Sequence, residues 1–179
     1  MSSDRCLLLQ ALDVGQVLEV KMNKIDFVSF SPTSPVKAIG TRNLNGCTAV
    51  LVVSKLGALL GHISPLPYPT TNPAAGENHM REKMTELWHL LFTVHNKSFP
   101  DPKKAGVVSA TLLGSVGLPA QKKLAEDIFK ENDVPVNTFL YDAQNSANMS
   151  AKGTVFIDGR QPSPIVYVED DEKPWFNFQ

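Results

Sequence analysis

The sequence predicts one mixed α/β domain with its helices outside the sheets. The chain has 179 residues, which suits a single domain with a sizeable core. Short apolar or alternating segments, typical of strands, occur before, between and after two amphipathic helical segments. This order lacks the strict strand–helix alternation of a Rossmann-like fold, so we expect a mixed sheet arrangement.

The first strands are expected within residues 16–30. Residues 16–22 alternate apolar and polar side chains, and residues 25–30 repeat that signal after a short turn at Asn23 and Lys24. These two segments therefore predict a hairpin. Residues 31–35 contain two prolines, which indicate a loop.

Two apolar runs at residues 48–54 and 56–63 predict adjacent buried strands. Cys47 lies at the beginning of the first run and His62 at the end of the second. If the strands pair as an antiparallel hairpin, these two ends lie side by side. The order of residues alone thus brings a thiol close to an imidazole.

A proline-rich segment at residues 64–78 leaves directly from His62 and predicts a loop. Long loops in compact domains are often functional, so this one is a candidate border of a site, with a plain connector as the alternative. Residues 77–95 predict an amphipathic helix, because apolar side chains recur there at spacings of three and four. The remaining predicted elements are a strand at 105–113, a helix at 119–132 and strands at 134–141, 153–157 and 164–168. The domain core is expected at about 15–169, between an N-terminal segment at 1–14 and an acidic, aromatic tail at 170–179 that caps a groove or contacts a partner.

The charge pattern argues against nucleic acid as a partner. The formal net charge is -1, and basic residues alternate with acidic ones, as on a solvated surface. The chain has neither an apolar stretch long enough to cross a bilayer nor a signal-peptide core, so we expect a cytoplasmic protein without a membrane partner; delivery to another cell stays open. The only two cysteines, Cys6 and Cys47, indicate neither a disulfide framework nor a structural zinc site.

The turn around Cys47 has the chemistry of a nucleophile site. Gly46 permits a tight bend that exposes the thiol and aims main-chain N–H groups, including that of Thr48, at a developing oxyanion, and Asn45 offers a side-chain donor. His62 is the candidate base, since its ordinary pKa lets it accept the thiol proton and return it to a leaving group. Thr41 or a main-chain carbonyl would orient the imidazole. An exposed thiol with a lowered pKa is therefore expected at Cys47.

The alternative is structural. A lone cysteine before an apolar strand is commonly a small buried hydrophobe, and a lone histidine is commonly a satisfied core residue.

The segment 43–48, Asn-Leu-Asn-Gly-Cys-Thr, resembles the Leu-Ser-Gly-Cys motif of the cytotoxic necrotizing factor family of glutamine deamidase toxins, with a histidine at a similar distance downstream. It is also similar to the Leu-Gly-Ser-Cys turn of the chemoreceptor glutamine deamidases. In that second family a threonine six positions before the cysteine belongs to the site, and Thr41 matches it. The resemblance covers about residues 15–169, by the order of elements more than by identity.

This resemblance implies a four-layer α/β/β/α fold, with two mixed, mainly antiparallel sheets packed face to face and helices outside. It also implies a reaction in which Cys47, assisted by His62, converts glutamine side chains of a protein substrate to glutamate through a thioester, without a cofactor. The chain departs from the pattern at two places. Asn45 stands where serine is usual, and residues 142–150 replace an expected glycine-rich stretch.

Ser64 and His79, at the two ends of the proline-rich segment, are candidates to line the site. Transfer of the acyl group to an amine remains open beside hydrolysis. Two other functions compete: a binding module whose loop and aromatic tail form a partner surface, and a metal-dependent hydrolase with Cys47, His62 and His79 as ligands.

Overall fold

The computed structural model describes residues 5–145 and 149–178, and it confirms the mixed α/β fold. Its helices are α1 (Leu7–Asp13), α2 (Ala75–His89) and α3 (Pro119–Glu131), with a π-helical turn at Leu90–Val94 and short 3-10 helices at Asn96–Ser98 and Pro174–Phe176. Its strands are β1 (Leu18–Glu19), β2 (Ile25–Ser29), β3 (Ala38–Thr41), β4 (Thr48–Val53), β5 (Gly57–Ile63), β6 (Lys104–Leu112), β7 (Ser115–Val116), β8 (Val136–Asp142), β9 (Val155–Asp158), β10 (Ile165–Val168) and β11 (Asp171–Glu172).

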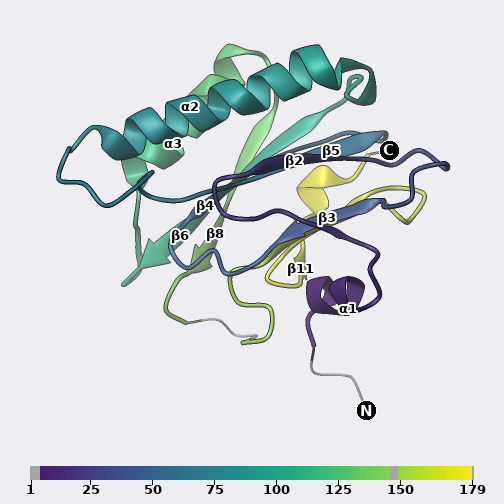
Figure 1. The fold of residues 1–179 in the computed structure, drawn as a ribbon, viewed down its shortest axis with the longest axis horizontal. Coiled ribbons are helices and arrows are strands. Elements are labelled where there is room, and N and C mark those ends of the chain that lie inside the picture. Colours follow the sequence, from purple (N-terminus) through teal and green to yellow (C-terminus); the bar gives the residue numbers. More distant parts are fainter. Residues whose placement is uncertain (1–4, 146–148, 179) are drawn as a thin grey trace.

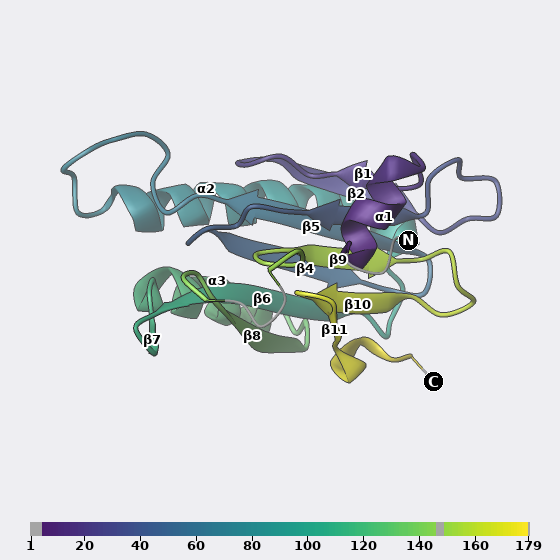
Figure 2. The same cartoon turned by 90° about the horizontal axis from the view of Figure 1, so that it is seen from below.

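The described strands form two sheets that pack face to face. One has the order β1-β3-β9-β10-β11, and the other has the order β2-β5-β4-β6-β7, with β8 also paired to β6. Most neighbours are antiparallel, whereas β1 with β3 and β6 with β8 are parallel. Helices α2 and α3 cover the outer face of the second sheet, and α1 lies at the first sheet (Figures 1 and 2).

Three apolar layers hold these elements together. One lies between the sheets and includes Leu51, Leu60 and Ile157. A second lies under α2 and α3, and a third packs α1 against β3 and β9. Every residue of β4 and β5 is buried, because both faces of their sheet are covered. The predicted antiparallel pairing of the two apolar runs is therefore confirmed.

The predicted hairpin at residues 16–30 is wrong. β1 pairs in parallel with β3, whereas β2 pairs with β5 in the other sheet. The chain crosses between the sheets near Asn23, which adopts a left-handed φ of 62°. Alternating side chains identify a strand but do not choose its partner, and each segment here pairs with a more distant strand.

Both ends of the chain contribute to the core, in contrast to the expected peripheral segments. Leu8 of α1 and Phe176 of the tail are fully buried, and Phe176 belongs to the layer between the sheets. Lys104 Nζ donates hydrogen bonds to the main-chain oxygens of Trp175 and Asn177, which fixes the tail. The aromatic tail is therefore packed into the fold rather than presented as a partner surface.

Candidate functional site

Cys47 lies in the turn that leads into β4. The turn is tight, since Cys47 N–H donates to the Leu44 main-chain oxygen at 2.6 Å. Asn45 and Gly46 have φ values of 40° and 99°, in the left-handed region that favours glycine. The glycine is therefore required by the backbone that presents Cys47, as the sequence predicted.

His62 in β5 and Cys47, immediately before β4, both face the space between the sheets. His62 pairs directly with Ala49, and Cys47 lies two residues before Ala49 on the same face. The two side chains are therefore diagonal neighbours, whose backbone positions are typically about 7–8 Å apart. The structure thus places the two residues on the same face of the β4–β5 pair, but no hydrogen bond joins the Cys47 thiol to His62 Nε2.

Thr41 comes from the other sheet and fixes the imidazole of His62. Thr41 Oγ1 donates to the Val20 main-chain oxygen at 2.8 Å and lies 2.7 Å from His62 Nδ1. Because the hydroxyl has one hydrogen and gives it to Val20, Oγ1 accepts the Nδ1 proton of the imidazole. Nε2 is then unprotonated, and it has no hydrogen-bond partner among the described residues. This is the tautomer that a general base needs.

Burial keeps the thiol and the imidazole neutral. Cys47 is 6% exposed and His62 is 3% exposed. Burial raises the pKa of the Cys47 thiol to about 11 and lowers the pKa of His62 to about 4. The expectation of an exposed thiol with a lowered pKa is therefore wrong for this conformation: Gly46 shapes the turn, but the sulfur stays beneath it.

Tyr141 clamps the cysteine turn, and the sequence analysis missed it. The Tyr141 hydroxyl accepts a hydrogen bond from Gly46 N–H at 2.9 Å and donates one to the Cys47 main-chain oxygen at 2.7 Å. Tyr141 itself is buried, which raises the pKa of its phenol. It lies 94 positions from Cys47, so no local sequence pattern could have indicated this contact.

These contacts correct the predicted set of oxyanion donors. The N–H of Gly46 is bonded to Tyr141, and that of Cys47 is bonded to Leu44. The backbone of Thr48 belongs to the β4–β5 pair, where Thr48 lies opposite Ile63. Its side chain is buried on the face of β4 opposite to Cys47 and has no hydrogen-bond partner among the described residues. The exposed side chain of Asn45 makes no hydrogen bond within the described part of the chain, so it remains the candidate hydrogen-bond donor to the oxyanion.

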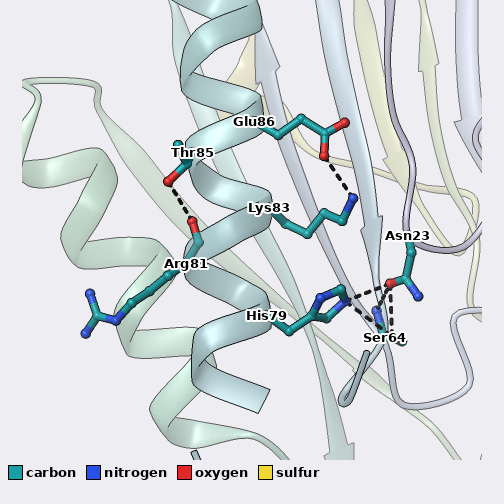
Figure 3. Close-up of polar contacts among 7 residues, drawn as sticks. All are labelled: Asn23, Ser64, His79, Arg81, Lys83, Thr85 and Glu86. Carbon is teal, nitrogen blue, oxygen red and sulfur yellow. Dashed lines mark hydrogen bonds and ion pairs between the residues drawn. The ribbon is translucent and has the colours of Figure 1, made fainter. Parts of the chain in front are cut away.

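Ser64 and His79 form a second polar cluster with Asn23 (Figure 3). Asn23 Oδ1 accepts from Ser64 N–H at 3.0 Å and from His79 Nε2–H at 2.9 Å. Asn23 also connects to the first site through its own N–H, which donates to the His62 main-chain oxygen at 2.6 Å. Ser64 and His79 therefore support the strand that carries His62, but their side chains do not bond His62 or Cys47.

The metal site considered for Cys47, His62 and His79 is not assembled. His79 Nε2 is engaged with Asn23, and no three His, Cys, Asp or Glu side chains of residues 5–145 and 149–178 gather as metal ligands. Both cysteines are free. No helix in the described residues is long and apolar enough to span a membrane.

Two comparisons with known proteins found no relative. The sequence matches no protein-family model, and no curated protein matches it.

Proposed function

We propose that this protein is a thiol amidohydrolase that deamidates glutamine side chains of a protein substrate, with Cys47 as nucleophile and His62 as base. The observation that carries the proposal is the hydrogen-bond chain from Val20 through Thr41 to His62. A buried histidine in a purely structural role would be expected to use both ring nitrogens. Here Nε2 is left with a free lone pair on the face that Cys47 shares.

The reaction follows from these groups. His62 Nε2 takes the Cys47 thiol proton, and the thiolate attacks the carboxamide carbon of glutamine. The resulting imidazolium gives its proton to the amide nitrogen, the C–N bond breaks and ammonia leaves. Water, deprotonated by His62, then attacks the thioester, and the sulfur leaves and regains a proton. Glutamine and water become glutamate and ammonia, and no cofactor is consumed.

The resting conformation must open for this chemistry. Proton transfer from a thiol with a pKa of about 11 to an imidazole with a pKa of about 4 is strongly uphill. Displacement of the turn at Asn45 and Gly46 by the substrate would expose the sulfur. It would also release the N–H groups of Gly46 and Cys47 from Tyr141 and Leu44, so that they could donate to the oxyanion. Substrate binding, rather than the free enzyme, then activates Cys47, which would limit side reactions of the thiol.

The direct experiment is mass spectrometry of a proteome incubated with wild-type protein or with Cys47→Ser. We expect glutamines converted to glutamate with the wild type alone, and lost conversion with His62→Ala. Cys6→Ser is the matched control, because Cys6 is also a free buried cysteine but lies at the N-terminus of α1. Conversion that is equal with wild type and Cys47→Ser, or absent from both, contradicts the proposal.

The second candidate is a binding module with a structural cysteine, and the burial of Cys47 favours it. The two functions differ in the reactivity of the thiol. In the binding module, iodoacetamide modifies Cys47 only after denaturation. In the enzyme, transient opening of the turn lets Cys47 react faster than Cys6 under native conditions.

A further inference from the structure

A pocket next to the candidate site is built from the proline-rich loop. Its walls include the exposed apolar side chains of Met22, Leu66 and Tyr68, together with the loop prolines, and its volume is about 420 Å³. No residue that lines it carries a charge. Exposed apolar side chains gathered in one hollow mark a binding surface more often than isolated ones do.

Hydrogen bonds anchor the first residues of the loop. Ser64 Oγ lies 2.6 Å from the Leu66 main-chain oxygen, to which it donates, and Gln121 Nε2 of α3 donates to the Pro65 main-chain oxygen at 2.9 Å. Gly76 allows this approach, since a Cβ there would lie 2.3 Å from Gln121 Nε2. A preformed apolar pocket loses little conformational entropy when it binds a ligand.

Asn23 adds a polar group to this wall. The backbone N–H of Ser64 donates to Asn23 Oδ1, which fixes the orientation of the amide and turns Nδ2 away from His79 (Figure 3). Nδ2 has no hydrogen-bond partner among the described residues. An uncharged apolar pocket with an amide donor at its edge is complementary to an apolar side chain with its adjacent peptide carbonyl.

Backbone hydrogen bonds link the residues that line the pocket to the strand that carries His62. Asn23 N–H donates to the His62 oxygen, and His62 N–H donates to the Lys24 oxygen. The loop lies at the end of the molecule away from α1 (Figures 1 and 2). A peptide bound in this pocket would therefore pass close to the strand end that carries His62.

We propose that this pocket is the specificity subsite, which binds an apolar side chain near the target glutamine in an extended segment of the substrate protein. The proposal rests on the proposed function for its substrate but makes a separate claim about which residues select it. The donor group of Asn23 would bind a main-chain carbonyl of the same segment, and Leu66 and Tyr68 would contact the apolar side chain.

Short peptides with a central glutamine in a Gly/Ser background test this, each with one leucine at a different position. For wild type, we expect one leucine position to raise kcat/KM for ammonia release about tenfold or more over the leucine-free peptide. Leu66→Ser and Tyr68→Ser should bring this ratio close to one. Leu56→Ser is the matched control, since Leu56 is an exposed leucine at the opposite end of the β4–β5 pair, and it should keep the wild-type ratio.

Direct binding separates failure of the subsite from failure of the catalytic proposal. The same peptides, fluorescently labelled, are titrated with Cys47→Ser protein, alone or combined with Leu66→Ser. Leucine-dependent binding that requires Leu66 supports the subsite even if no peptide is deamidated. Asn23→Asp keeps an acceptor for Ser64 and His79 but lacks the donor, and it should weaken binding several-fold.

Two results of the peptide assays would overturn the subsite: no leucine preference in either assay, or a preference that Leu66→Ser and Tyr68→Ser leave intact. A concentration-dependent dimer that dissociates in Leu66→Ser would also overturn it, because the pocket would then bind a second copy of the chain. Sedimentation of wild type and Leu66→Ser decides this point.

Discussion

Removal of one oxygen atom, in Tyr141→Phe, tests whether the cysteine turn is held by the phenol. The hydroxyl makes two hydrogen bonds to the backbone of Gly46 and Cys47. Each is worth about 1 kcal/mol net, and the Cys47 carbonyl left unpaired in a buried position costs a further 1–3 kcal/mol or so. Gly46 is half-exposed, so its N–H can bind water instead. Together these terms predict a loss of about 2–4 kcal/mol in the free energy of unfolding.

Equilibrium unfolding in urea measures this loss. With a typical dependence of about 2–3 kcal/mol per molar urea, the midpoint should fall by about 1 M. Tyr167→Phe is the matched control, because Tyr167 is half-buried and its hydroxyl has no hydrogen-bond partner in the described residues. The loosened turn should also let iodoacetamide reach Cys47 faster in native protein, with Cys6 as the internal reference. If the two Tyr→Phe variants differ by less than about 0.5 kcal/mol, the clamp is refuted.

Three further predictions concern other parts of the structure. Thr41→Val should remove the acceptor for His62 Nδ1–H, so nitrogen NMR of labelled histidine should show a mixture of the two His62 tautomers. Thr41→Ser should keep Nδ1 protonated. Identical spectra of the two variants would refute the hydrogen bond from His62 Nδ1–H to Thr41. Burial lowers the pKa of His62 from 6.5 to about 4, so between these pH values the unfolded chain binds a proton that the folded protein does not. The folded protein therefore has its full stability above about pH 6.5, and its free energy of unfolding falls by up to about 3 kcal/mol as the pH falls towards 4. Urea unfolding across this pH range should show the loss of stability, and the stability of His62→Gln should depend less on pH. An equal pH dependence in wild type and His62→Gln would contradict the lowered pKa of His62. Phe176→Ala should lower the free energy of unfolding by about 3–5 kcal/mol because the Phe176 ring is fully buried, whereas Phe92→Ala, at an exposed position, should lower it little. Thermal unfolding compares the two variants. Equal melting temperatures would mean that the tail does not stabilise the fold.

Part of the candidate site could be predicted because its members are close in the sequence. Cys47 immediately precedes β4, and His62 lies in β5, which follows after a short turn. Uninterrupted apolar runs predicted that both strands are buried. Antiparallel pairing of two consecutive strands places the beginning of the first next to the end of the second. Gly46 could likewise be predicted, since a tight turn before a strand needs a residue that accepts a positive φ.

The oxyanion donors could not be predicted from the turn alone. Glycine and asparagine indicate a bend with free N–H groups, but whether those groups are free depends on what packs against them. Tyr141, from β8, binds the N–H of Gly46, and Leu44 binds that of Cys47. Periodicity places residues on a face of a strand but does not identify their partners in another element.

By itself, the sequence determined the mixed α/β composition, the β4–β5 pair and the positions of Cys47 and His62 at one end of that pair. These follow from local periodicity, which acts over a few residues. Only the tertiary structure decided the pairing of β1 with β3, the burial of Phe176 and the protonation of His62. His62 lies 21 positions from Thr41, and the two side chains meet only when the two sheets close on each other. That closure also removes water from Cys47, and the loss of water raises the pKa of its thiol.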